Sequence, residues 1–222
     1  MVEMRDLNQK KMHIAISGNI GAGKVSLAEK LASHYHMQVI FEEVAKNPYL
    51  GDFYMDMTRW AFHIQVFFLN SRFRQNLRIQ ATSDSVIQGR TVYEDAFVFA
   101  KNLNQAGLLN DRDYQTYLDI YQTIKPFITP PNLMIYLRTG IPKLVRNIQE
   151  RSRAFENSIR LDYLRDLNNL YEQWITEYKE SNLLVIEADK IDFINNVEDF
   201  AYIVRLIESE IHGLFSKKDP AV

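Results

Sequence analysis

The stretch that most constrains what this chain can fold into is residues 14–27, which read IAISGNIGAGKVSL. An apolar run enters a turn with three glycines, and a lysine and an amphipathic segment follow at once, so the pattern predicts a strand, a loop and a helix. Glycines let successive backbone N–H groups point at phosphate oxygens, and the new helix adds the positive end of its dipole. The spacing of Gly18, Gly23 and Lys24 fits the Walker A pattern, in which the lysine reaches the β- and γ-phosphates.

The alternative interpretation of these residues is a glycine-rich turn that binds nothing. The strand before the turn and the helix after it favour a nucleotide-binding origin. One metal ligand is missing from the pattern, because the residue after the lysine is normally Ser or Thr, which holds Mg²⁺, and here it is Val25.

Composition excludes several other classes of protein. The chain has 222 residues, enough for one domain with a full core, and its 26 Lys and Arg against 28 Asp and Glu leave no broad basic field for nucleic acid or anionic lipid. It has no cysteine and five scattered histidines, so we expect no disulfide and no metal site. Residues 1–11 form a polar, flexible lead without the apolar core of a signal peptide, and no run is long enough to span a membrane, so a cytoplasmic location is expected.

Short apolar runs alternate with amphipathic segments along the whole chain, which predicts an α/β fold with a five-stranded parallel sheet covered on both faces. The predicted strands are residues 12–17, 38–41, 85–88, 133–137 and 183–186. The predicted helices are residues 25–35, 53–79, 111–123, 141–148, 161–178 and 197–214. There is no internal repeat or low-complexity linker, so residues 1–222 are expected to form a single domain.

Three groups of polar residues stand out on this framework. Glu42 follows the second strand, at the sheet edge where open α/β folds bind ligands, although a solvated strand end is an equal alternative. Gln65 and Arg72 are seven residues apart on one helix face, and an amide and a guanidinium there can read a base. Arg151 and Arg153 lie on a charged connector, which is usually a solvated helix end but is also what a phosphoryl-transfer lid needs.

Together these residues resemble the deoxynucleoside kinases, particularly the bacterial deoxyadenosine/deoxyguanosine type. Five motifs carry the resemblance, in order and over nearly the whole chain: GNIGAGK from Gly18, EEV from Glu42 with NPYL from Asn47, RW from Arg59 with Gln65 and NSR from Asn70, RTVYED from Arg90, and RSR from Arg151 with Glu156. The resemblance implies a P-loop kinase fold with an arginine-bearing lid. It also implies transfer of the γ-phosphoryl group of ATP to the 5′-hydroxyl of a deoxynucleoside, for nucleotide salvage.

The resemblance also implies a role for each matching residue. Glu42 is the general base at the 5′-hydroxyl, Arg90 lies beside the reacting phosphoryl group, and Lys24 completes the catalytic set. The phosphate-binding residues are Gly18, Asn19, Ile20, Gly21, Ala22, Gly23, Lys24, Val25 and Ser26. The lid residues are Arg151 and Arg153, and the substrate-binding residues are Glu42, Tyr54, Gln65, Arg72, Arg90, Asp95, Phe99 and Glu156. Within the last set, Tyr54 and Glu156 hold the sugar 3′-hydroxyl, and Gln65, Arg72 and Asp95, with Phe99 as a wall, bind a purine or cytosine.

Two departures from the family both concern Mg²⁺, which the family uses with ATP. Val25 replaces Ser or Thr, and Gly89 replaces the acidic residue that precedes Arg90. Loss of both removes side chains that anchor the metal, so the alternative to an active kinase is a catalytically impaired nucleotide-binding subunit that pairs with an active paralogue. A nucleoside monophosphate kinase is a third hypothesis, against which the uncharged contacts of Tyr54 and Gln65 argue. The family also implies a dimer, either a homodimer or a heterodimer with that paralogue.

Overall fold

The computed structural model describes residues 11–41, 47–151 and 159–216, with side chains described as far as residue 211. Five strands form one parallel sheet in the order β2-β3-β1-β4-β5. The strands are β1 (His13–Ser17), β2 (Gln38–Ile40), β3 (Val86–Gly89), β4 (Leu133–Arg138) and β5 (Asn182–Glu187). The predicted five-stranded parallel sheet is therefore confirmed, and the strand that leads into the glycine-rich turn is its central strand.

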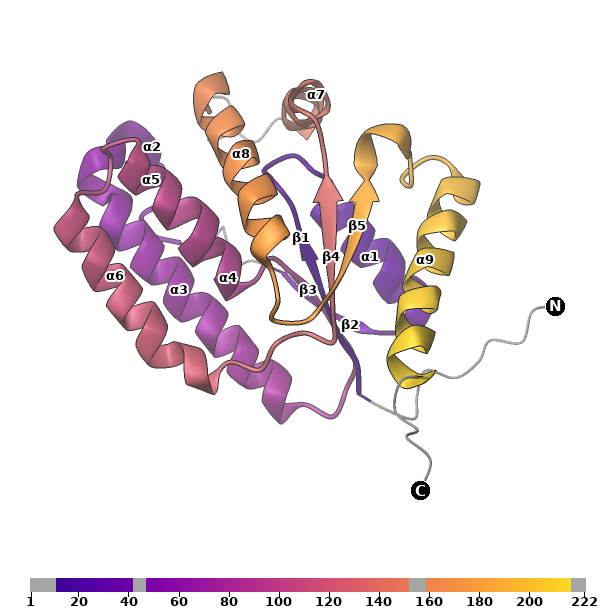
Figure 1. The fold of residues 1–222 in the computed structure, drawn as a ribbon. Helices are drawn as coiled ribbons and strands as arrows, with labels where there is room; N and C mark the ends of the chain where they lie inside the picture. Colours follow the sequence, from indigo (N-terminus) through magenta and orange to yellow (C-terminus); the bar gives the residue numbers. More distant parts are fainter. Residues whose placement is uncertain (1–10, 42–46, 152–158, 217–222) are drawn as a thin grey trace.

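Helices connect the strands and cover both faces of the sheet (Figure 1). The longer helices are α1 (Lys24–Tyr35), α3 (Met57–Ala81), α6 (Asp111–Ile124), α7 (Ile141–Arg151), α8 (Leu161–Glu177) and α9 (Val197–Ser216). The shorter ones are α2 (Leu50–Met55), α4 (Val92–Glu94), the π-helix Asp95–Ala100 and α5 (Lys101–Gln105). None of these described helices combines the length and the apolar character that a membrane span needs.

Alternation along the strands divides the core in two, because successive side chains of a strand point to opposite faces. Ile14 and Ile16 of β1 pack with α1, α7 and α9 on one face, whereas Ala15 packs with the π-helix, α6 and α8 on the other. Figure 1 shows the same division, with α1 and α9 on the side of the sheet away from α3, α4 and α8. Both faces are buried, as the short and almost wholly apolar strand sequences predicted.

The structure corrects one predicted helix and shows another helical segment that was not predicted. The long helix expected over residues 53–79 is two helices, α2 and α3, which are separated at Asp56. Asp56 is the N-cap of α3, and its side chain accepts a hydrogen bond from the backbone N–H of Arg59, so the polar residue ends one helix and starts the next. The segment after β3, for which no helix was predicted, contains a π-helix over Asp95–Ala100.

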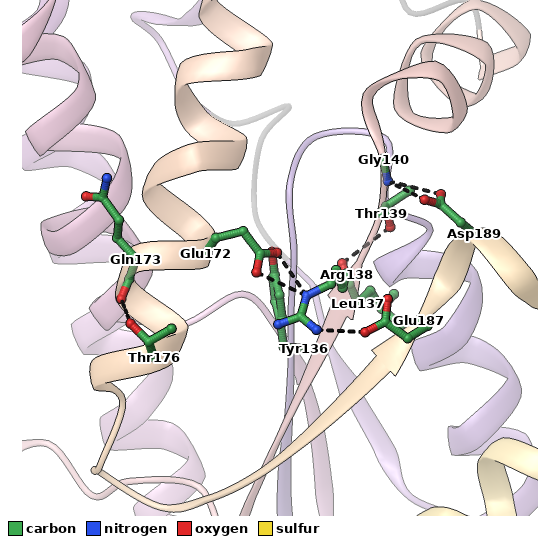
Figure 2. Close-up of polar contacts among 10 residues, drawn as sticks. All are labelled: Tyr136, Leu137, Arg138, Thr139, Gly140, Glu172, Gln173, Thr176, Glu187 and Asp189. Carbon is green, nitrogen blue, oxygen red and sulfur yellow. Dashed lines mark hydrogen bonds and ion pairs between the residues drawn. The ribbon is translucent and has the colours of Figure 1, made fainter.

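Ion pairs tie α8 to the two strands at one edge of the sheet (Figure 2). Arg138, at the end of β4, contacts Glu172 of α8 at 3.0 Å and Glu187 of β5 at 2.7 Å. The Tyr136 hydroxyl donates to the same Glu172 carboxylate at 2.9 Å. These charged groups are partly exposed, so the network contributes little to stability and mainly fixes how α8 lies against the sheet.

Candidate active site

The glycine-rich turn is a compact loop whose backbone only glycine can adopt without strain. Gly21 and Gly23 have φ of 85° and 89°, in the left-handed region. The loop also lies against its neighbours: a Cβ on Gly21 would be 2.7 Å from the carbonyl oxygen of Leu144, and one on Gly23 would be 3.1 Å from the Phe193 ring. Both conformation and close approach therefore require glycine at these two positions.

The lysine of the motif lies against this loop. Lys24 Nζ donates to the carbonyl oxygens of Gly18 and Asn19, at 2.7 and 2.8 Å. The Ala22 N–H donates to the same Asn19 carbonyl at 3.1 Å, which closes the turn. Lys24 is also the first residue of α1, so its ammonium group and the positive end of the helix dipole lie together. The arrangement is that of an anion-binding loop.

Two helices from distant parts of the chain hold the loop. The Asn19 side-chain amide donates to the Leu164 carbonyl and to Asn168 Oδ1 of α8, at 3.0 and 3.1 Å. From α7, the Asn147 amide donates to the Gly21 carbonyl oxygen at 2.7 Å. Sequence reasoning missed Asn147 and Asn168, because neither belongs to a recognised motif.

Arg90 follows β3 and reaches the site through a strained backbone. Its φ is 70°, an uncommon value for a residue with a side chain, and its N–H donates to the Ile16 carbonyl at 2.9 Å. The guanidinium lies 4.3 Å from the centroid of the Phe99 ring, and its Nε is 3.9 Å from Glu94 Oε2. Strain of this kind is concentrated at functional sites.

Glu94 is a fully buried carboxylate behind Arg90, and sequence reasoning passed over it. It accepts hydrogen bonds from the Thr91 N–H and from the Tyr171 hydroxyl, each at 2.9 Å. Burial, with the nearby Glu94 charge, raises the pKa of Tyr171 well above its ordinary value, so this hydroxyl remains a donor. Glu94 thus fixes the first turn after β3 and provides a negative charge beside Arg90.

The predicted base-binding residues lie in the interior. Arg72 of α3 forms an ion pair with Asp95 of the π-helix, with Nε and Oδ2 2.5 Å apart, and both side chains are almost fully buried. Gln65, two turns earlier on the same face of α3, is also buried, and its Oε1 has no hydrogen-bond partner among the described residues. A buried acceptor without a partner costs about 1–3 kcal/mol, so packing alone does not explain an amide at this position.

Tyr163 of α8 interacts electrostatically with Tyr54 of α2 and with Arg90. Burial raises the pKa of Tyr163, the Tyr54 hydroxyl adds to this rise, and the charge of Arg90 opposes it. Tyr163 therefore lies within electrostatic reach of both groups. The role predicted for Tyr54 at the sugar stays a prediction.

A buried polar chain runs beneath the end of β2. His13 Nε2 lies 3.0 Å from Gln88 Oε1, Gln88 donates to Gln75 at 3.4 Å, and Gln75 donates to the Phe41 carbonyl at 3.0 Å. Burial lowers the pKa of His13 to about 4, so the ring is neutral at physiological pH. The chain fixes the backbone of Phe41, at the end of the strand that precedes Glu42.

Several predicted residues lie outside the described part of the chain, namely Glu42, Arg153 and Glu156. Arg151, the other predicted lid residue, is the exposed last residue of α7. Phe99, the predicted wall of the base site, is buried and packs edge-on against Tyr171.

Neither of the two positions that depart from the family offers a side-chain ligand for magnesium. Val25 is 41% exposed and carries no oxygen, and Gly89 has no side chain. In the described ranges, no group of three His, Asp or Glu side chains could hold a metal ion.

The site thus places an anion-binding loop at the carboxyl end of β1, with an arginine after the neighbouring β3 and a buried amide, guanidinium and carboxylate behind it. Such a site can bind a polyphosphate at one side and a planar polar ring at the other.

Comparisons with known proteins agree with this arrangement. The deoxynucleoside kinase family model matches residues 14–212. The chain is 44% identical over 202 residues to a deoxyadenosine kinase of Dictyostelium discoideum, covering 91% of this chain and 80% of that protein. It is 32% identical to a deoxyadenosine/deoxycytidine kinase of Bacillus subtilis, covering 91% of this chain and 94% of that one.

Among solved structures, a deoxyadenosine kinase of M. mycoides with the products dCMP and a flexible dCDP bound superposes with a TM-score of 0.80. It is 26% identical, and the match covers 89% of this chain and all of that one. The family match includes β1, the phosphate loop, Arg90 and the buried residues Gln65, Arg72 and Asp95. The chain therefore belongs to the deoxynucleoside kinase family.

Proposed function

We propose that this protein transfers the γ-phosphoryl group of ATP to the 5′-hydroxyl of a deoxynucleoside, for nucleotide salvage. The observation that carries the proposal is the buried set on α3 and the π-helix: the Arg72–Asp95 ion pair and, beside it on α3, the Gln65 amide without a partner for its oxygen among the described residues. A chain that only bound a nucleotide at its phosphate loop would need no second buried polar set. Replacing a buried ion pair by apolar residues is often neutral or stabilising, so fold stability alone does not explain the pair.

The chemistry follows from the positions of the groups. The phosphate loop, Lys24 and Arg90 bind the triphosphate and offset charge on the transferred phosphoryl group. Glu42 comes two residues after β2 and takes the proton of the 5′-hydroxyl; the freed oxygen forms a bond to the γ-phosphorus as the bond to the β–γ bridging oxygen breaks. ADP leaves with that oxygen, and Arg151 and Arg153 contribute lid charges.

The base is best matched by adenine. A glutamine amide can pair with both a ring nitrogen and the amino group of adenine, and the Asp95 carboxylate accepts from an amino group. Phe99 provides an apolar wall, while Tyr54 and Glu156 are proposed to hold the 3′-hydroxyl. Guanine and cytosine also offer an amino group, so deoxyguanosine and deoxycytidine are the next candidates.

The test is ADP release from ATP and Mg²⁺ with each of the four common deoxynucleosides. Deoxyadenosine is expected to give the highest kcat/KM. A Gln65→Leu variant should raise KM for deoxyadenosine about tenfold, because one base contact is worth about 1–3 kcal/mol. Gln105→Leu, at an exposed amide of α5, is the matched control and should leave KM unchanged.

Absence of deoxynucleoside-dependent ADP release would overturn this proposal. It would favour the impaired subunit that Val25 and Gly89 suggest, provided that calorimetry still shows ATP binding. The ADP assay and an ATP titration with and without Mg²⁺ together separate the two functions, because turnover identifies the kinase and ATP binding without turnover identifies the impaired subunit.

We also propose that the chain works as a single domain, in the cytoplasm, and as a homodimer or a heterodimer with a paralogue. No basic field or membrane-spanning run in the sequence suggests a nucleic-acid or membrane partner. Sedimentation equilibrium of the purified chain checks the dimer: a monomer at all concentrations would contradict the homodimer.

A further inference from the structure

We infer that Asn147 is a positioning residue that sets the phosphate loop and couples it to the arginine at the end of α7. The inference rests on the proposed function and names a residue that its mechanism does not use. Asn147 acts on the reaction through Gly21 and Arg151, not by contact with the reacting atoms.

Asn147 contacts the loop at its most constrained point. Its side-chain amide donates to the Gly21 carbonyl oxygen at 2.7 Å. Gly21 has φ of 85°, and a Cβ there would meet both the Leu144 carbonyl and the Ile148 side chain within 2.9 Å. The loop therefore rests on one face of α7, and Asn147 supplies the hydrogen bond of that contact.

The start of α7 is anchored to the rest of the site, so the helix is a fixed support. The Gly140 N–H donates to the Asp189 carboxylate, at 3.0 Å to each oxygen (Figure 2). Lys143 Nζ donates to the carbonyl oxygens of Ala188 and Ile191, at 2.5 and 2.9 Å. These contacts join α7 to the segment after β5.

That same segment also contacts the phosphate loop, through Phe193 beside Gly23. The loop is therefore held at Gly21 by α7 and at Gly23 by a segment tied to α7. A shift of α7 relative to the sheet would move both contacts together.

Arg151 lies one helical turn after Asn147, so the two side chains share a face of α7. Because Asn147 faces the phosphate loop, the Cα of Arg151 lies on the same side of α7, about 6 Å further along the helix axis. The hydrogen bond to Gly21 thereby fixes how far this arginine is from bound phosphates.

The hydrogen bond also has an electrostatic effect. A carbonyl oxygen that faced the phosphates would repel them, and the Asn147 amide holds the Gly21 oxygen toward α7 instead. The amide is neutral, so it orients the loop without adding a charge that competes with the triphosphate.

The first experiment compares Asn147→Leu, which keeps the size but removes the donor, with Asn147→Gln, which retains a donor. Asn147→Leu should raise KM for ATP about five- to tenfold, the value of one hydrogen bond, while KM for the deoxynucleoside stays the same. Asn147→Gln should recover part of the loss. Asn169→Leu, an exposed amide of α8, is the matched control and should change neither constant.

The second experiment is a double-mutant cycle with Arg151→Gln. If Asn147 acts through Arg151, the combined loss in kcat/KM for ATP should be smaller than the product of the single losses by about threefold or more. Fully multiplicative losses, or an equal rise of both KM values, would overturn the inference.

Calorimetric ATP affinity of the same variants needs no turnover. An unchanged ATP affinity in a folded Asn147→Leu protein overturns the inference, even where the kinase activity stands. Loss of the proposed activity in the unmodified chain with ATP affinity still dependent on Asn147 would instead reject only the proposed function.

Discussion

Removal of the Tyr171 hydroxyl should destabilise the protein far more than removal of an equally buried tyrosine hydroxyl elsewhere. Tyr171 and Tyr117 are both fully buried. The Tyr171 hydroxyl donates to the buried Glu94 carboxylate at 2.9 Å, whereas the Tyr117 hydroxyl has no hydrogen-bond partner among the described residues. Tyr171→Phe and Tyr117→Phe thus make the same chemical change in two different environments.

The magnitude follows from the charge of the acceptor. A hydrogen bond to a charged group contributes about 1.5–3 kcal/mol, and Glu94 retains the Thr91 N–H as a donor, so we expect a loss of about 2 kcal/mol for Tyr171→Phe. For a protein of this size, that loss lowers Tm by about 4–8 °C. Tyr117→Phe removes a buried polar atom that makes no such bond, so the free energy of unfolding should be unchanged or should rise slightly.

The assay is urea unfolding of the two variants and the parent without ligands, followed by far-UV circular dichroism, with the midpoints compared at equal slopes. Equal losses in the two variants, or a larger loss for Tyr117→Phe, would refute the reasoning. If only Tyr171→Phe changed the dependence of the unfolding free energy on urea, the variant would differ in compactness. The Tm values from thermal melts would then be used to compare the stability of the two variants.

Three further predictions follow from the same structure. Gly21→Ala should abolish ATP binding in calorimetry. Alanine in this left-handed backbone costs about 1–3 kcal/mol, and its Cβ would lie 2.7 Å from the Leu144 carbonyl oxygen. A retained ATP affinity would contradict the loop geometry. The double variant Val25→Thr with Gly89→Asp should raise kcat in a coupled ADP assay. Its free energy of unfolding should change by less than about 0.5 kcal/mol, because Val25 is exposed and a Cβ on Gly89 meets nothing within 4 Å. An unchanged kcat would show that these two positions do not limit turnover. Burial lowers the pKa of His13 to about 4 in the folded protein, whereas in the unfolded chain the ring takes up a proton near pH 6.5. As the pH falls from 6.5 to 4, protonation therefore favours the unfolded chain, and the free energy of unfolding should drop by up to about 3 kcal/mol. Urea midpoints across this range check the trend, which His13→Gln should flatten.

The predictions from sequence were best where the signal is local. The strand, loop and helix of residues 14–27, and the apolar runs of the other strands, follow from patterns that one segment carries by itself. The break at Asp56 was missed because the apolar spacing continues across it and only its capping side chain interrupts the helix. The π-helix over Asp95–Ala100 was not predicted, because a short apolar run does not by itself distinguish a helix from a strand.

In the candidate site, too, local features were predictable from the sequence and contacts between distant segments were not. Gly18, Gly23 and Lys24 are recognisable from spacing because a phosphate loop is one continuous stretch of backbone. The Arg72–Asp95 pair joins residues that the sequence could only place in the same set, and the close contact between them depends on how α3 packs against the π-helix.

The sequence by itself determined the fold class, the phosphate loop and the family, since each depends on order and spacing along the chain. Only the tertiary structure decided that Glu94 and Tyr171 form a buried pair behind Arg90 and that Asn147 holds Gly21. Their partners are more than seventy residues away in the chain, and whether such side chains meet depends on how helices pack around the sheet, which no local pattern encodes.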